Sequence, residues 1–182
     1  MTQHELLDQL EADLREMLAF VRNHIATLPE AALHARSGMD RWNTLECFAH
    51  LNAYSDYYLS RIDLATHKAK ARKWESGLSM KSSWAERSAI RRVNPEVTFK
   101  KRKSPKKFNF IHVSLGNEEI KRFVINTEKL LRCMQAARET DLNKPRIPMA
   151  HNSMFKFRPG NLFRYLVLHT KRHLAQIRQT MA

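Results

Sequence analysis

Cysteine, glycine and proline are scarce in this sequence, and each scarcity narrows the class of protein. Among 182 residues there are two cysteines, four glycines and six prolines. Two cysteines cannot supply the disulfide framework of a small secreted domain, so we expect Cys47 and Cys133 to be reduced thiols in a cytoplasmic protein. The sequence also has no glycine-rich loop between a strand and a helix, which argues against a dinucleotide-binding or P-loop enzyme.

Long apolar runs and a basic leader are missing as well. No uninterrupted apolar run approaches about 18 residues, the length that indicates a membrane-spanning helix. The first sixteen residues carry five acidic side chains and one arginine, the opposite of a secretory or transit peptide. A chain of this length suits one domain that buries roughly 70% of its unfolded surface. We therefore expect a single cytoplasmic domain, residues 1–182, with its own core and no membrane contact.

Apolar residues recur at spacings of three and four, which predicts helices. Four segments show this pattern, near residues 4–28, 43–65 and 117–138, and from Pro159 almost to the C-terminus. The glycines and prolines lie outside these segments or at their edges. Asn43 and Glu46 have the spacing of a capping box, so we interpret Glu46 as a capping residue rather than as a general base. The expected fold class is all-α, a four-helix bundle.

A long connection, residues 66–116, separates the second and third predicted helices. It far exceeds the 2–8 residues typical of bundle connections, and it contains a predicted short helix from Ser83 through Arg92. Its aromatic residues, which we expect to cover one end of the bundle, are Trp74, Trp84, Phe99, Phe108 and Phe110. The connection should therefore be partly ordered rather than a free loop.

The same connection carries most of the positive charge. Between Thr66 and Lys107 there are fourteen lysines and arginines and three glutamates, a balance of +11 out of the chain's +14. Such a segment can bind nucleic acid or attract an anionic small molecule. It can equally be a solvated basic surface, and no recognised nucleic-acid-binding motif accompanies it. Both interpretations of residues 66–107 stay open.

Three histidines in the predicted helices have the arrangement of a metal site. His169 and His173 are four residues apart on the apolar side of the last helix, where side chains at this spacing share one face. His50, in the second helix, is the third candidate. A buried imidazole needs a hydrogen-bond partner or a metal. Three protein ligands would leave a coordination position open, as in catalytic rather than closed structural zinc sites.

Histidine pairs at this spacing also occur on solvated helix faces, so the residues alone leave a metal-free site open. His24 lies on the apolar stripe of the first predicted helix, and we expect it to be buried near the pocket. The histidines at helix ends or in connections, to which we assign no role, are His4, His34, His67, His112 and His151. Polar neighbours that the pattern offers for the site are Tyr54, Tyr57, Tyr165 and Gln176.

Two segments carry a family resemblance. WNTLECFAHL at 42–51 and LHTKRHLAQI at 168–177 resemble the DinB/YfiT-like superfamily, and the resemblance covers most of the chain. It implies a four-helix bundle of up-down-down-up topology that holds a divalent metal, commonly nickel, zinc or iron. One ligand comes from the second helix and two from the fourth, which are His50, His169 and His173 here. Members with known activity include bacillithiol transferases and mycothiol-dependent isomerases.

The sequence therefore favours a metal-dependent enzyme, a hydrolase or thiol transferase acting on a small molecule, with zinc, nickel or iron and a low-molecular-weight thiol as candidate cofactors. The alternative is a non-catalytic binding protein whose basic connection engages nucleic acid or an acidic partner. A homodimer is left open. Three imidazoles do not select one metal, because zinc, nickel, copper and iron all accept this ligand.

Overall fold

The computed structural model describes residues 1–77, 79–100 and 103–181, and the described chain is mostly helical. The long helices are α1 (Gln3–Phe20), α3 (Thr44–Ala71), α5 (Glu118–Ala137) and α6 (Pro159–Met181). The shorter helical elements are η1 (Val21–Ile25, a π-helix), α2 (Glu30–His34), α4 (Trp84–Val93) and η2 (Lys106–Phe108, a 3₁₀ turn). Two short strands, β1 (Ile147–Met149) and β2 (Asn152–Phe157), pair antiparallel.

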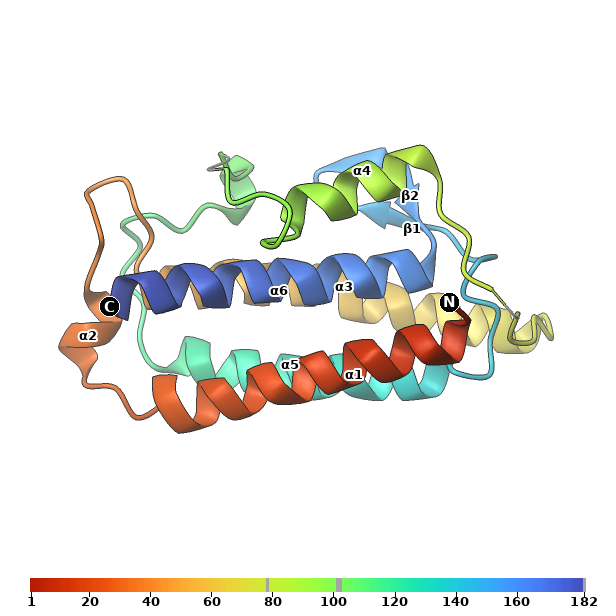
Figure 1. Cartoon of the computed structure of the whole chain (residues 1–182), viewed down its shortest axis with the longest axis horizontal. Helices are drawn as coiled ribbons and strands as arrows, with labels where there is room; N and C mark the ends of the chain where they lie inside the picture. The colour runs from red at the N-terminus through yellow and green to blue at the C-terminus, as the bar shows by residue number, and fades with distance from the viewer. Residues whose placement is uncertain (78, 101–102, 182) are drawn as a thin grey trace.

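The long helices lie side by side around an apolar core. α1 and α6 run in one direction, whereas α3 and α5 run in the other (Figure 1). α3 packs against α5, and α1 packs against α6. Large side chains that are almost completely buried between them include Leu7, Leu14, Phe48, Tyr58 and Phe163. No helix of the described residues is long and apolar enough to cross a membrane.

Two connections, the long one between α3 and α5 and the one between α5 and α6, are folded onto the outside of this helical core. α4 packs against α6, and β1 contacts α3 (Figure 1). α4 begins with a capping box between Ser83 and Glu86, as the sequence predicts. The hairpin β1–β2 was not predicted. It is held by a tertiary contact, because the backbone N–H of Ala150 donates to the Tyr58 hydroxyl at 3.0 Å.

The prediction that His24 is buried near the pocket is wrong. The helix widens to a π-helix at η1, where the backbone N–H of Ala26 donates to the carbonyl of Val21. In this wider turn the residue four positions after Val21, rather than three, returns to the core-facing side. Ile25 is therefore buried, while His24 is exposed and its ring lies beside that of Phe20, with centroids 5.3 Å apart.

Glu86 joins α4 to the start of α6. Its buried carboxylate accepts hydrogen bonds from the backbone N–H groups of Ser83 (2.8 Å) and Arg158 (2.7 Å), and it pairs with the Arg158 guanidinium. Burial raises the pKa of Glu86, but the hydrogen bonds from Arg158 and Ser83 outweigh this effect, so that the pKa is lowered. A carboxyl group whose pKa is lower in the folded state stabilises the fold above its unfolded-state pKa.

We expect Glu86→Gln to lower the free energy of unfolding by about 2 kcal/mol at pH 7, because Arg158 loses its partner. This difference should shrink as the pH falls below about 4.5, since protonation then removes the same interaction from the wild-type protein. Urea unfolding of both proteins at several pH values measures it. A difference that is independent of pH would contradict the assignment.

Candidate metal centre

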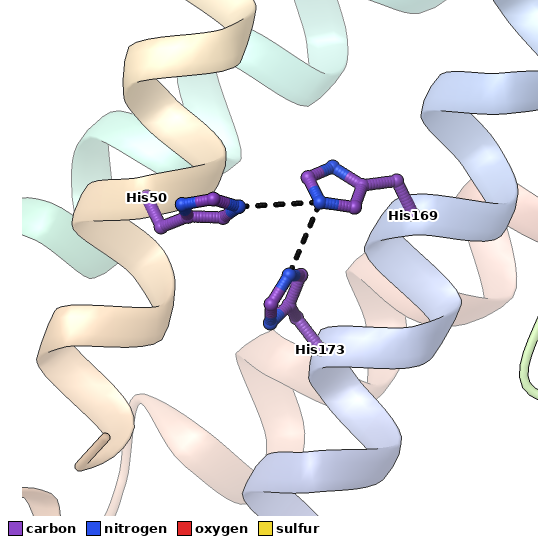
Figure 2. A group of neighbouring side chains, drawn as sticks. All are labelled: His50, His169 and His173. Atoms are coloured by element: carbon purple, nitrogen blue, oxygen red, sulfur yellow. Dashed lines mark hydrogen bonds between the residues drawn. The ribbon is translucent and has the colours of Figure 1, made fainter. Parts of the chain in front are cut away.

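Three histidine side chains from two helices converge on one point. His50 projects from α3, and His169 and His173 project from successive turns of α6 (Figure 2). The Nε2 atom of His169 lies 3.2 Å from Nε2 of His50 and 3.1 Å from Nε2 of His173. One ligand atom from each ring lies within 4.8 Å of the others. The structure thus brings together all three histidines that the sequence singles out, and the group could hold a metal ion.

The surroundings keep these imidazoles uncharged. His50, His169 and His173 are 3%, 6% and 8% exposed. Burial lowers the pKa of His50 to about 4. Burial lowers the pKa values of His169 and His173 well below the usual range, and the repulsion that a proton on one ring would meet from the other rings and from Arg172 lowers them further. All three rings are therefore neutral at pH 7, which is the state in which imidazole binds metals.

The long connection fixes the orientation of the His50 ring. Nδ1 of His50 lies 2.7 Å from the backbone carbonyl oxygen of Phe108, which has no proton of its own, so Nδ1–H is the donor. The proton is then on Nδ1, and Nε2 turns an unprotonated lone pair toward the other two histidines. The hydroxyl of Ser104 donates to the same carbonyl at 3.1 Å.

The donor set fits a divalent transition metal. Nε2 of His50 carries no proton, and Nε2 of His169 lies close to the Nε2 atoms of both His50 and His173. A single Nε2–H on His169 can donate to only one of these two atoms. If all three rings are neutral, one of the two close nitrogen pairs therefore has no proton between its atoms. Nitrogen ligands about 2.0–2.1 Å from a tetrahedral metal lie about 3.3 Å apart, close to the two separations of 3.2 and 3.1 Å that join His169 to His50 and His173. Nδ1 of His173 is also buried without a hydrogen-bond partner among the described residues.

An indole ring packs against two of the three imidazoles. Trp42 stacks on His173 with ring centroids 5.7 Å apart and an interplanar angle of 20°, and its centroid lies 4.7 Å from that of His50. Its Nε1–H donates to the Oδ1 atom of Asn109 at 3.1 Å. Trp42 directly precedes the capping box of α3, and nothing in the sequence pattern predicts its place within the site.

Two buried tyrosines pack against the ring of His169. The ring of Tyr54 is 4.8 Å from that of His169, and Tyr165 stacks on His169 at 5.7 Å. Burial raises the pKa of Tyr54 to about 12 and that of Tyr165 well above its usual value. Both hydroxyls therefore keep their protons at pH 7. Of the other proposed polar neighbours, Gln176 lines the same cavity, whereas Tyr57 packs under the Arg61 guanidinium.

A cavity of about 1230 Å³ opens above the histidines. α4, the hairpin β1–β2, residues 40–42 and part of the long connection form its walls. Among the aromatic residues of the connection, Trp84 and Phe99 line the cavity and Phe108 is buried beside Tyr54, with ring centroids 4.4 Å apart. His151 also lines the cavity, which the sequence does not predict, because this residue lies in a connection without helical periodicity.

The remaining candidate residues have structural roles. Glu46 completes the capping box with Asn43, which confirms its interpretation as a capping residue. Its carboxylate also binds the Arg36 guanidinium at 2.6 and 2.7 Å and the backbone N–H of His112 at 2.5 Å. Cys47 is buried as a free thiol, and burial raises its pKa. The Cys47 thiol therefore keeps its proton, and the residue acts as a small core residue rather than as a nucleophile.

A family model described as the DinB superfamily matches residues 9–177, which include both helices that carry the three histidines. Neither the curated proteins nor the solved structures include a match to the chain.

Proposed function

Because the chain belongs to the DinB superfamily, we propose that it is a metal-dependent enzyme acting on a small molecule, with His50, His169 and His173 as the metal ligands. The observation that carries the proposal is the convergence of three neutral, buried Nε2 atoms beside a large cavity. We further propose that α1, α3, α5 and α6 form the up-down-down-up bundle of this superfamily.

The residues around the histidines suit either hydrolysis or thiol transfer. A divalent metal held by three imidazoles supplies Lewis acidity at a position open to substrate. Tyr54 and Tyr165 retain their protons, so their hydroxyls can donate hydrogen bonds to negative charge that develops on a substrate. Trp42 and the Phe108 carbonyl hold the imidazole rings in place. Zinc, nickel and iron all match this ligand set.

The first test is the metal content of protein purified without a histidine tag. We expect about one transition metal ion per chain, since one three-ligand site is proposed. A protein that contains no metal, and takes up none of zinc, nickel, iron or manganese on reconstitution, would exclude the proposal.

The second step of the test separates the two reactions. Low-molecular-weight thiols should change the visible absorption of the cobalt- or nickel-substituted protein, because soft sulfur ligands bind these metals. His50→Ala should abolish the response while the protein remains helical by circular dichroism. If several thiols leave the spectrum unchanged, thiol transfer is excluded, and turnover of activated esters or amides then tests hydrolysis.

The alternative function, a binding protein for nucleic acid or an acidic partner, depends on the basic connection. Lys100 and Lys103 are exposed, whereas Lys101 and Arg102 of the same run lie outside the described residues. Salt-dependent nucleic-acid binding by a metal-free protein would favour this alternative. We also propose that the protein is cytoplasmic, an assignment supported by its two free cysteines; a homodimer stays a prediction from the sequence.

A further inference from the structure

The cavity above the histidines is larger than a metal ion and its immediate ligands require. Its volume of about 1230 Å³ exceeds the roughly 300–1,000 Å³ typical of small-molecule sites. Trp84 and Phe99 line it, yet they are 76% and 42% exposed. Large aromatic side chains that face an open cavity offer apolar surface to a ligand. The site therefore has room and contact area for the body of an organic molecule.

The charges around the cavity have one predominant sign. Its basic lining residues are Arg41, Arg92, Lys103 and Arg172, and Asp40 is its one acidic residue among those that the structure describes. A cleft lined by charges of one sign concentrates ligands of the opposite sign. Arg172 already donates to the carbonyl oxygens of Thr98 and Lys100, at 2.6 and 2.7 Å, and so holds the connection beside the cavity.

α4 presents a helical stripe to the cavity. The residues of this helix that line the cavity are Trp84, Ala85, Ser88, Ala89, Arg92 and Val93, at the spacings that place side chains on one face. Of these six residues, Ala85, Ser88 and Ala89 are small and Trp84 and Val93 are apolar, so Arg92 is the one charged side chain that α4 contributes to the cavity lining. Glu86, on another face, is turned into the protein and bound to Arg158. Among the described residues Arg92 has no acidic partner.

We propose that the cavity binds a small organic anion, with Arg92 contacting its carboxylate, sulfonate or phosphate group and Trp84 and Phe99 contacting its apolar part. The inference rests on the proposed function, because it assigns a substrate class to the same site. A planar guanidinium binds such oxyanions through two parallel hydrogen bonds. Arg92 is thus the specificity-determining residue, whereas the three histidines bind the metal.

The test compares a charged probe with its neutral analogue on the metal-loaded protein. Isothermal titration calorimetry should give 4-phenylbutyrate an affinity at least about tenfold higher than that of 4-phenylbutanamide, a difference of about 1.4 kcal/mol. Arg92→Gln should weaken the binding of the anion about tenfold and leave the amide unchanged. The affinity for the anion should also fall as salt is added, because the arginine is exposed.

Arg91→Gln is the matched control. Arg91 is exposed on the same helix but does not line the cavity, so this variant removes the same charge at nearly the same place. Its affinity for both probes should stay at the wild-type value. Equal effects of the two variants would overturn the proposal, as would equal affinities of the anion and the amide for the wild-type protein.

Metal analysis of the same samples separates this proposal from the proposed function. A carboxylate that binds only the metal would keep its preference over the amide in Arg92→Gln, which overturns the role of Arg92 and leaves the metal site intact. The opposite outcome is a protein that takes up no metal but still prefers the anion in a way that depends on Arg92. It would overturn the metal-dependent function and support the anion site.

Discussion

Replacing His169 by alanine is expected to lower the affinity for the metal by at least about 100-fold, since even the loss of residues that only support metal ligands costs 10–100-fold. His169 is the central member of the group, because its Nε2 atom is the one within 3.2 Å of both other Nε2 atoms. Without it, two ligands remain on different helices. Competition with a chromogenic chelator measures the change in affinity.

The metal-free variant should stay folded, because the core between the long helices consists of packed apolar side chains that need no metal. Thermal melts of both proteins without metal test this expectation. His24→Ala is the control, since His24 is exposed on η1 and its loss should leave metal affinity unchanged. Wild-type metal affinity in His169→Ala would show that the ion binds elsewhere.

Glu46→Gln is expected to lower the free energy of unfolding by roughly 3 kcal/mol, a value typical of breaking a buried ion pair. Glu46 is 0% exposed, and its carboxylate binds the Arg36 guanidinium, the N-terminal cap of α3 and the N–H of His112 together. A neutral amide cannot satisfy all of these donors, so a buried partner is left unpaired. Chemical unfolding at pH 7 measures the loss.

Glu128→Gln is the matched control for that experiment. Its carboxylate pairs with Arg22 at the surface, with side chains 39% and 51% exposed, and such pairs contribute at most about 1 kcal/mol. Similar losses in the two variants would contradict the assigned role of Glu46. A selective loss in Glu46→Gln should be accompanied by weaker metal binding, because the His112 contact anchors the connection that supports His50.

The sequence predicts best where local chemistry sets a boundary. The capping box of Asn43 and Glu46 marks the start of α3, and Pro159 is the first residue of α6. The expected end of α3 near residue 65 is wrong, because the helix continues to Ala71. In the last turns Ala69 is buried while Lys68 and Lys70 are exposed. These turns consist of small and charged residues, so they lack the large apolar residues whose spacing predicts a helix.

Features that depend on distant contacts were not predictable. The hairpin β1–β2 has little apolar alternation and is fixed by the Tyr58 hydroxyl, which no local pattern reveals. The three histidines are recognisable from spacing, whereas the stacking of Trp42 on His173 and the cavity face of α4 require the packed chain. The sequence likewise identifies the basic connection, but only the fold shows that Arg92 lines the cavity and that Arg91 does not, although both are exposed.

The hydrogen bond from His50 to the Phe108 carbonyl couples metal binding to the ordering of the connection, so that each favours the other. A metal on Nε2 requires the proton to be on Nδ1, which is the tautomer that donates to Phe108. Whatever holds residues 104–108 in place therefore raises metal affinity, and a bound metal stabilises this segment by the same factor. Sequence changes in the connection can accordingly retune the metal site without altering any histidine.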